Sequence, residues 1–344
     1  MSIFQPAVKE KLLARVAIDG PTGSGKTWTA LQWARVLAGP TGIIGGIDTE
    51  NRSMAYYAPT PAQLAGTEPI ERLNWWDAPY EFGHAPITPP YDPRQLGKLI
   101  DAAAADLAAT ADRPAGVLVI DSLTHYWNGE GGTLDIVDDA SSRSGNSFTG
   151  WKEGTPAQRY MLDKIIHAPF HVIVTMRSKM EYVLETQVKN GKTIQVPKKV
   201  GMAPEQRAGV EYEFTVVADM DLEHRLVISK SRCSLIADAV MPNGRSVEPA
   251  HTFAEWLGSG VERVTAQTAT QFIDRMNAIA DEAKRKAIKE AFVAEFGRPS
   301  ELTTDRIGEV TAWLTVQCGE AAGLVPDDAP VTGALADAVA EVSE

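Results

Sequence analysis

The most constraining feature of this chain is a glycine-rich stretch at residues 20–27, GPTGSGKT, which fits the pattern G-x-x-x-x-G-K-[ST] at every defined position. An apolar run at 14–18 precedes it, and a segment rich in Ala, Leu and Trp follows it at 26–38. Glycines let backbone N–H groups wrap around phosphate oxygens where a Cβ would collide, and the start of the following helix adds positive potential. We therefore expect a phosphate-binding loop whose contacts are Gly20, Pro21, Thr22, Gly23, Ser24, Gly25, Lys26, Thr27 and Trp28.

The loop favours a nucleoside triphosphate with magnesium. Lys26 is expected to reach the β- and γ-phosphates, and the Thr27 hydroxyl is expected to bind Mg²⁺. A dinucleotide fingerprint does not fit, because no G-x-G-x-x-G can be placed over these glycines. The guanine-reading pattern N-K-x-D is absent from the chain, so ATP is expected in preference to GTP.

The pattern of apolar runs predicts the fold class. Short runs at 14–18, 43–47, 117–120, 171–175, 214–218 and 226–228 are separated, early in the chain, by helical segments. Several runs are continuous rather than alternating, which is typical of strands buried on both faces of a parallel sheet. We therefore predict an α/β fold with a mainly parallel central sheet flanked by helices.

The character of the sequence changes after residue 258. Apolar residues recur at helical spacing in 272–283, and two further helices are expected before and after residues 297–299. The last part of the chain, 320–344, carries six acidic residues and no Lys or Arg. The predicted boundaries are 1–258 for the core, 259–325 for a small C-terminal helical unit and 326–344 for an acidic flexible tail.

Two carboxylates follow predicted strands near the phosphate loop. Asp121 ends the apolar run at 117–120, where the carboxylate on the Mg²⁺ side of a P-loop NTPase is expected. Glu50 closes the second predicted strand in the sequence Ile-Asp-Thr-Glu. Its spacing alone leaves two possibilities open: a residue that polarises the attacking water, or a turn carboxylate in solvent.

Taken together, these motifs resemble the RecA-type branch of P-loop ATPases over about residues 12–240. In that branch the catalytic Glu stands in an Ile-Asp-x-Glu context, matched at residues 47–50, and an Asp-Ser follows the next apolar strand, matched at 121–122. A later strand carries two basic residues, one apart, that reach the nucleotide of a neighbouring subunit; Lys230 and Arg232 match that spacing. The resemblance implies Mg²⁺-dependent ATP hydrolysis in a homo-oligomer, with Glu50 orienting water and nucleotide at the subunit interfaces.

Further stretches, at 121–127, 150–152 and 199–202, are similar to phage and prophage RecA-fold ATPases described as AAA-type ATP-binding proteins. Part of that group is linked to single-strand annealing and recombination, which implies DNA, in single-stranded form, as a partner. The chain departs from RecA in the strand at 172–177, which lacks the Gln that senses the γ-phosphate; Thr175 or Arg177 is the candidate. The long N-terminal helix used for filament contacts is also missing, so a ring and a filament both remain open.

The distribution of charge suggests where DNA would bind. The chain has a net charge of −12, yet residues 177–207 are net positive by four. We expect a hairpin at 179–207 with its turn at 189–192, and a mobile Ser/Gly-rich loop at 129–150. The candidate DNA contacts are Lys179, Lys189, Lys192, Lys198, Lys199, Arg207 and Arg143. A solvated basic hairpin is the alternative, and the acidic tail is either a DNA mimic or a solubilising segment.

The remaining features limit the cellular compartment and the classes of function that we expect. No apolar run reaches the roughly 18 residues of a membrane span, and the N-terminus shows no signal peptide. Two isolated cysteines build neither a disulfide framework nor a zinc site, which favours a reducing cytoplasm, that of a bacterial host if the chain is phage-encoded. Three functions remain: a DNA-stimulated ATPase of recombination or annealing, working with a single-strand-binding or replication protein; an ATP-driven motor or helicase-like protein of replication or packaging; and an ATP-gated DNA-coating protein with little turnover.

Overall fold

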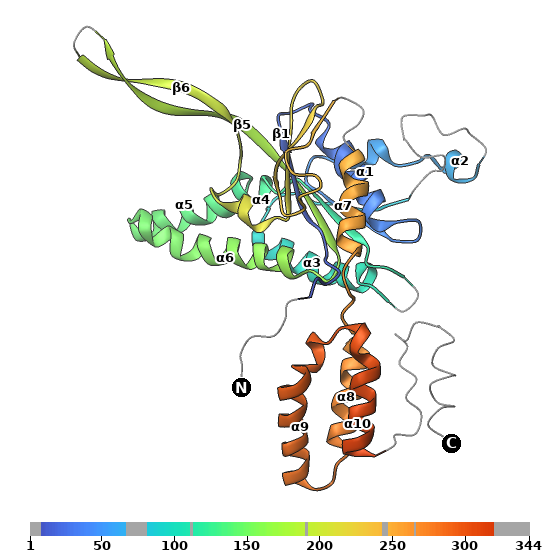
Figure 1. Ribbon diagram of the computed structural model, residues 1–344. Helices are drawn as coiled ribbons and strands as arrows, with labels where there is room; N and C mark the ends of the chain where they lie inside the picture. The colour runs from blue at the N-terminus through green and yellow to red at the C-terminus, as the bar shows by residue number, and fades with distance from the viewer. Residues whose placement is uncertain are drawn as a thin grey trace. The chain divides into compact units, whose positions relative to one another are not determined.

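The computed structural model describes residues 8–66, 81–110, 113–189, 192–242, 247–264 and 266–319, which divide into two compact units (Figure 1). The larger unit is Leu13–Trp256, and the smaller one combines the first twelve residues with the chain from Leu257 onward. Within the smaller unit, Lys11 N–H donates to the Val261 carbonyl at 2.7 Å. The larger unit thus begins at Leu13 and ends at Trp256, whereas the predicted core spans 1–258. The predicted acidic tail lies outside the described residues.

The larger unit is built on one mainly parallel sheet, as the apolar runs predict. Its strand order is β3-β2-β4-β5-β1-β7-β8-β9, and β6 pairs with β5 alone. The pairs within β3-β2-β4-β5-β1-β7 are parallel, whereas β7–β8, β8–β9 and β5–β6 are antiparallel. The strands are β1 Arg15–Gly20, β2 Ile44–Asp48, β3 Gly83–Pro86, β4 Val117–Asp121, β5 His171–Lys189, β6 Lys192–Pro204, β7 Val216–Met220, β8 Leu226–Ser231 and β9 Val240–Met241.

Helices complete both units. In the larger unit they are α1 Lys26–Ala38, η1 Ser53–Tyr57, α2 Pro61–Leu64, α3 Pro93–Leu107, α4 His125–Asn128, α5 Thr133–Ser144, α6 Ser147–His167 and η2 Val210–Glu213, and α7 spans Glu248–Gly258. The smaller unit holds α8 Ala266–Asn277, α9 Glu282–Phe296, η3 Pro299–Glu301, η4 Thr304–Arg306 and α10 Ile307–Cys318. Within the described ranges, no helix combines the length and the apolar character needed to span a membrane.

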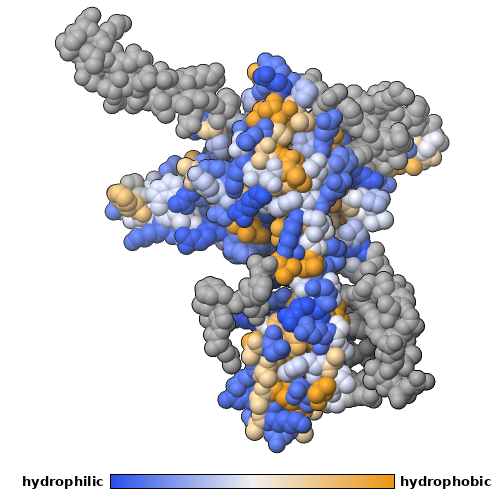
Figure 2. Space-filling view, in the orientation of Figure 1, coloured by the Kyte–Doolittle hydropathy of each residue, from blue (hydrophilic) through white to orange (hydrophobic). Residues whose placement is uncertain are grey.

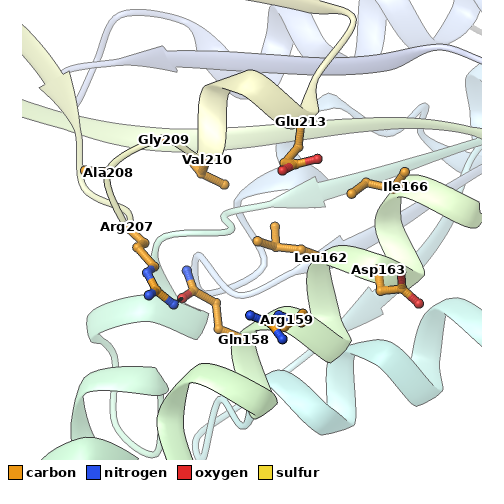
Figure 3. Close-up of a pocket in the computed structure, with 10 residues that line it drawn as sticks. All are labelled: Gln158, Arg159, Leu162, Asp163, Ile166, Arg207, Ala208, Gly209, Val210 and Glu213. Atoms are coloured by element: carbon orange, nitrogen blue, oxygen red, sulfur yellow. Dashed lines mark hydrogen bonds between the residues drawn. The ribbon is translucent and has the colours of Figure 1, made fainter. Parts of the chain in front are cut away.

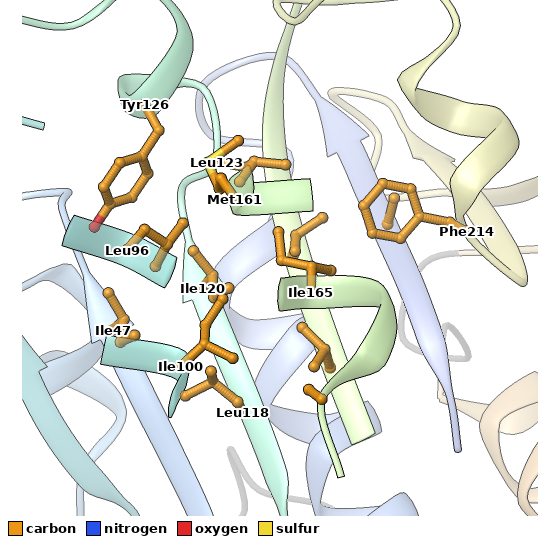
Figure 4. Packing of buried hydrophobic residues seen from close by; sticks show 14 of the residues in the cluster. Ile47, Leu96, Ile100, Leu118, Ile120, Leu123, Tyr126, Met161, Ile165 and Phe214 are labelled. Carbon is orange, nitrogen blue, oxygen red and sulfur yellow. The ribbon is translucent and has the colours of Figure 1, made fainter. Parts of the chain in front are cut away.

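An apolar core joins the sheet to α3 and α6 (Figure 4). Leu96 of α3, Met161 of α6 and Ile120 of β4 are all fully buried in it. Every residue of β4 is buried, which explains why its sequence is continuously apolar rather than alternating. Burial on both faces fixes the position of β4 relative to its neighbouring strands. It thereby also fixes the position of Asp121, the last residue of the strand.

The segment at 129–150 is helical, so the prediction of a mobile loop there is wrong. Buried residues at helical spacing, Thr133, Val137 and Ala140, seat α5 within the unit. Gly145 ends α5 in the left-handed conformation, and the Asn146 side chain caps α6 by accepting the Phe148 N–H. Hydrophilic residues cover most of the visible face of this helix pair (Figure 2). The Ser, Gly and Asn residues that suggested a loop form only the short corner between two helices.

β5 is a single strand with two successive partners. Its first part, up to Arg177, pairs with β1, and from Ser178 onward it pairs with β6 in a long hairpin. The described strands end at Lys189 and Lys192, as the predicted turn requires. Figure 1 shows the hairpin continuing beyond the sheet. The strand therefore connects the carboxyl edge of the sheet to the basic hairpin without a break in secondary structure.

The smaller unit has its own apolar core between α8, α9 and α10. Phe272 and Met276, two members of the predicted helical stripe, are each 3% exposed in it. The Trp313 ring lies edge-on to Phe292 and Phe296, with ring centroids 5.8 and 5.5 Å away. Separate burial of this kind is what allows the helical unit to be compact by itself.

Candidate nucleotide site

The glycine-rich stretch forms the turn between β1 and α1. Gly23 and Gly25 have φ angles of 84° and 94°, in the left-handed region that favours glycine. A Cβ at Gly20 would lie 2.6 Å from the Met220 carbonyl oxygen, so the backbone there leaves no room for a side chain. The Ser24 hydroxyl is buried and has no hydrogen-bond partner among the described residues. An orphaned buried hydroxyl in a glycine-shaped cradle at a helix N-terminus fits a phosphate group.

Lys26 folds back onto this loop. Its Nζ donates hydrogen bonds to the carbonyls of Gly20 and Pro21, both at 2.8 Å. Burial lowers the pKa of the Lys26 ammonium, although the carboxylates of Asp121 and Glu50 act in the opposite direction. The lysine is thus held beside the cradle, where a triphosphate would offer it better partners than two neutral carbonyls.

Thr27 and Asp121 meet at the start of α1. The Thr27 hydroxyl donates to Asp121 Oδ2 at 2.6 Å, and Thr175 donates to the other carboxylate oxygen. Asp121 is 2% exposed, and burial raises its pKa while the two hydroxyl donors lower it. A hydroxyl and a carboxylate oxygen at this distance are donors that suit Mg²⁺. Thr27 and Asp121 would hold the ion, which supplies charge neutralisation at phosphate oxygens when bound.

The turn after β2 presents Glu50 to the same region. The Asp48 carboxylate accepts the N–H groups of Glu50 and Met54, at 2.8 and 2.9 Å, and also contacts His84 Nε2 at 3.0 Å. These bonds hold the turn in one conformation. Because β2 and β4 are neighbours in the sheet, Glu50 stands beside the residues that follow Asp121.

Glu50 is engaged rather than solvated. Its carboxylate accepts bonds from Ser122 Oγ at 3.0 Å and from Arg177 Nε at 2.9 Å, and a second Arg177 nitrogen contacts Oε2. Burial by itself would raise the pKa of Glu50, but the Arg177 hydrogen bonds and charge, with His125 and Ser122, outweigh it and lower the pKa. The geometry therefore disfavours the alternative of a turn carboxylate in solvent.

The two candidates for the γ-phosphate sensor have different surroundings. The hydroxyl of Thr175, which is fully buried, donates to Asp121, whereas Arg177 is 40% exposed in its side chain and paired with Glu50. Neither interaction touches the phosphate loop itself. Thr175 is thus placed to orient the Asp121 carboxylate, and Arg177 to orient that of Glu50.

Lys230 and Arg232, expected to act on a neighbouring subunit, differ in their surroundings. Lys230 Nζ donates to the carbonyls of Glu211, Tyr212 and Phe214 at 2.9, 2.9 and 2.6 Å, which uses all three of its hydrogens within the chain. These carbonyls are at the end of η2, where a cation is favoured. Within this chain Lys230 thus stabilises the carbonyl end of η2, and its action on the nucleotide of a neighbouring subunit stays a prediction. Arg232, just beyond β8, is exposed.

Comparison with known proteins decides the family. A model of the AAA domain family matches residues 13–238, most of the larger unit. The chain belongs to the AAA domain family. This AAA domain protein is an ATP hydrolase with an α/β P-loop core, and it binds nucleotide. An ATPase from the type III secretion system of pathogenic bacteria aligns over 92% of this chain and 87% of its own, at 12% identity and a TM-score of 0.33. No curated protein matches the chain.

The AAA domain protein does not gather the candidate DNA residues in one place. Lys179 is exposed near the base of the hairpin, and the strands that carry Lys189, Lys192, Lys198 and Lys199 form its outer part. Arg143 lies at the end of α5 and pairs with Glu153 at 2.8 Å. Arg207 packs 5.5 Å from the Trp151 ring centre and lines a separate pocket of about 260 Å³ against α6 (Figure 3). Five of the seven candidates therefore lie on the two strands of the hairpin, whereas Arg143 is on α5 and Arg207 packs against α6.

Sequence reasoning missed two residues at or beside the phosphate loop in this AAA domain protein. His224, in the turn between β7 and β8, has a φ of 58°, and its Nδ1 lies 3.0 Å from the Ser24 carbonyl oxygen. Asp19, directly before the loop, faces Asp219 across the β1–β7 pair. Burial and the Asp219 carboxylate raise the pKa of Asp19 to about 7. No local signal marks these residues, because their partners are distant in the chain.

Proposed function

We propose that this ATP hydrolase acts on single-stranded DNA through its β5–β6 hairpin, in phage recombination or annealing. The observation that carries the proposal is the continuity of β5. Up to Arg177 the strand lies in the sheet between β1 and β4, beside the phosphate loop and Asp121, and from Ser178 it forms the hairpin. A ligand on the hairpin would therefore pull on a strand that forms part of the nucleotide site.

The charge of the hairpin favours a polyanion. Residues 178–204 contain five lysines and two glutamates, within a chain whose net charge is −12. Lys189 and Lys192 are cross-strand partners beside the turn. A local basic segment on an acidic protein is the electrostatic pattern expected of a phosphate-binding surface.

In the proposed reaction, the loop amides and Lys26 neutralise the triphosphate, Thr27 and Asp121 hold Mg²⁺, and Glu50 orients the attacking water. Arg232 would act on the nucleotide of a neighbouring subunit, so that hydrolysis depends on a ring or filament of identical chains. The cytoplasm of a bacterial host is the proposed setting, with a single-strand-binding or replication protein as the further partner.

The test is ATP hydrolysis and DNA binding by the full chain. We expect single-stranded DNA to stimulate hydrolysis in the wild type and Lys26→Ala to abolish it. Replacing Lys189 and Lys192 together by Gln should weaken DNA binding. The fall of the logarithm of the binding constant with the logarithm of the salt concentration should become less steep by about 1.4. Lys164→Gln is the matched control, because Lys164 pairs with Asp101 on α3, away from the hairpin.

Three results would contradict the proposal. Hydrolysis that ignores every nucleic acid would remove DNA as the partner. Strand displacement or translocation on duplex DNA would favour the motor. If Glu50→Gln loses ATP hydrolysis but keeps DNA binding and assembly, an ATP-gated DNA-coating protein would be favoured.

A further inference from the structure

The carboxylate proposed to orient water is occupied by an arginine. Both oxygens of Glu50 contact the Arg177 guanidinium, and Oε1 also accepts the Ser122 hydroxyl. A carboxylate has about four acceptor positions and orients water by accepting its hydrogen at a free one. Arg177 fills two of these positions and Ser122 a third, which leaves one on Oε2. In this arrangement Glu50 is poorly placed to act on water.

Arg177 stands where β5 changes partner. It is the last residue of β5 in register with β1, opposite Gly20, and the next residue begins the pairing with β6. Its carbonyl accepts the Glu205 N–H at 2.6 Å, and its own N–H donates to Thr124 Oγ1 at 2.9 Å. The backbone of Arg177 is thus bonded both to the chain leaving the hairpin and to the segment after β4.

We propose that Arg177 is a positioning residue that holds Glu50 in a resting state, and that a polyanionic strand bound to the hairpin withdraws it. The second half of this inference rests on the proposed function. A displacement of the hairpin base acts directly on Arg177, because the Arg177 carbonyl accepts the N–H of Glu205, the residue that follows β6. Once the guanidinium leaves, Glu50 keeps the Ser122 bond and regains free acceptor positions. The ATP hydrolase is then slow without its ligand because its own arginine competes with water.

The decisive variant is Arg177→Gln, assayed in the full chain without DNA. The pair is partly exposed, so its loss should raise basal kcat by about fivefold, the factor equivalent to about 1 kcal/mol. The KM for ATP should stay unchanged, and added single-stranded DNA should give little further stimulation. Arg177→Lys, which keeps the charge but not the bidentate geometry, should lie between the variant and the wild type.

The chain offers a matched control. Arg263 makes a bidentate pair with Glu10, at 2.6 and 3.2 Å, in the smaller unit, with comparable exposure of both side chains. Arg263→Gln should leave kcat unchanged with and without DNA. The double variant Arg177→Gln/Glu50→Gln should fall to the level of Glu50→Gln, because the added activity passes through Glu50.

The outcomes separate the alternatives. A fall of basal kcat in both Arg177→Gln and Arg177→Lys, with ATP still bound, would mean that Arg177 acts on the phosphate, and would overturn the proposal. A rise in kcat together with failure of the wild type to bind single-stranded DNA would keep the resting state and overturn its release by a polyanion, as well as the proposed function. If Arg177→Gln does not fold, as judged by thermal denaturation, the direction of kcat in Arg177→Lys decides.

Discussion

Thr175→Val tests whether the buried hydroxyl on β5 orients Asp121. Thr175 is fully buried and donates to an Asp121 oxygen, while the other oxygen accepts from Thr27. Valine has nearly the same shape but cannot donate. Loss of a hydrogen bond to a buried carboxylate should cost about 1.5–3 kcal/mol in the free energy of unfolding. Thr175→Ser keeps the hydroxyl and removes one methyl group, which should cost only about 0.8 kcal/mol.

The assay is urea denaturation of both variants, with Mg²⁺ affinity measured by calorimetry in the presence of nucleotide. Because Thr175 restrains a proposed metal ligand, Thr175→Val should weaken Mg²⁺ binding by about 10- to 100-fold, whereas Thr175→Ser should bind as the wild type does. If the valine variant is at least as stable as the serine variant and binds Mg²⁺ equally well, the hydroxyl does not orient Asp121.

Three further predictions concern the framework of the larger unit. Arg15, 7% exposed, donates to the carbonyls of residues 166, 168 and 170 at the end of α6, so Arg15→Leu should lower the free energy of unfolding by at least about 3 kcal/mol in urea. Burial and the nearby Arg15 lower the pKa of His171 to about 4, and its Nδ1 accepts a backbone N–H. The stability it contributes is therefore complete above pH 6.5 and is lost as pH falls toward 4; denaturation at several pH values should show this loss reduced in His171→Asn. A Cβ at Gly150 would lie 2.2 Å from the Val137 carbonyl oxygen, so Gly150→Ala should cost about 1–3 kcal/mol by thermal denaturation, whereas Gly308→Ala, where nothing lies within 4 Å, should be neutral or stabilising.

The sequence alone could predict features that depend on neighbouring residues. The phosphate loop is one, because its cradle is made of consecutive backbone groups and a helix start that residues 20–27 specify together. The parallel sheet is another, since the continuous apolar run of β4 is expected only where both faces are buried. Where local composition competed with packing, it misled: the Ser and Gly residues around 145 outweighed the buried stripe of Thr133, Val137 and Ala140.

Only the tertiary structure decided how the site residues are engaged. Glu50 and Arg177 are 127 positions apart, and Ser24 and His224 are 200 apart, so no spacing rule relates them. Lys230 matched a basic pair in the sequence, yet its ammonium is taken up by carbonyls of its own chain. The physical reason is common to all three: a charged or polar group takes the nearest partner that satisfies its hydrogen bonds, and the fold determines which partner is nearest.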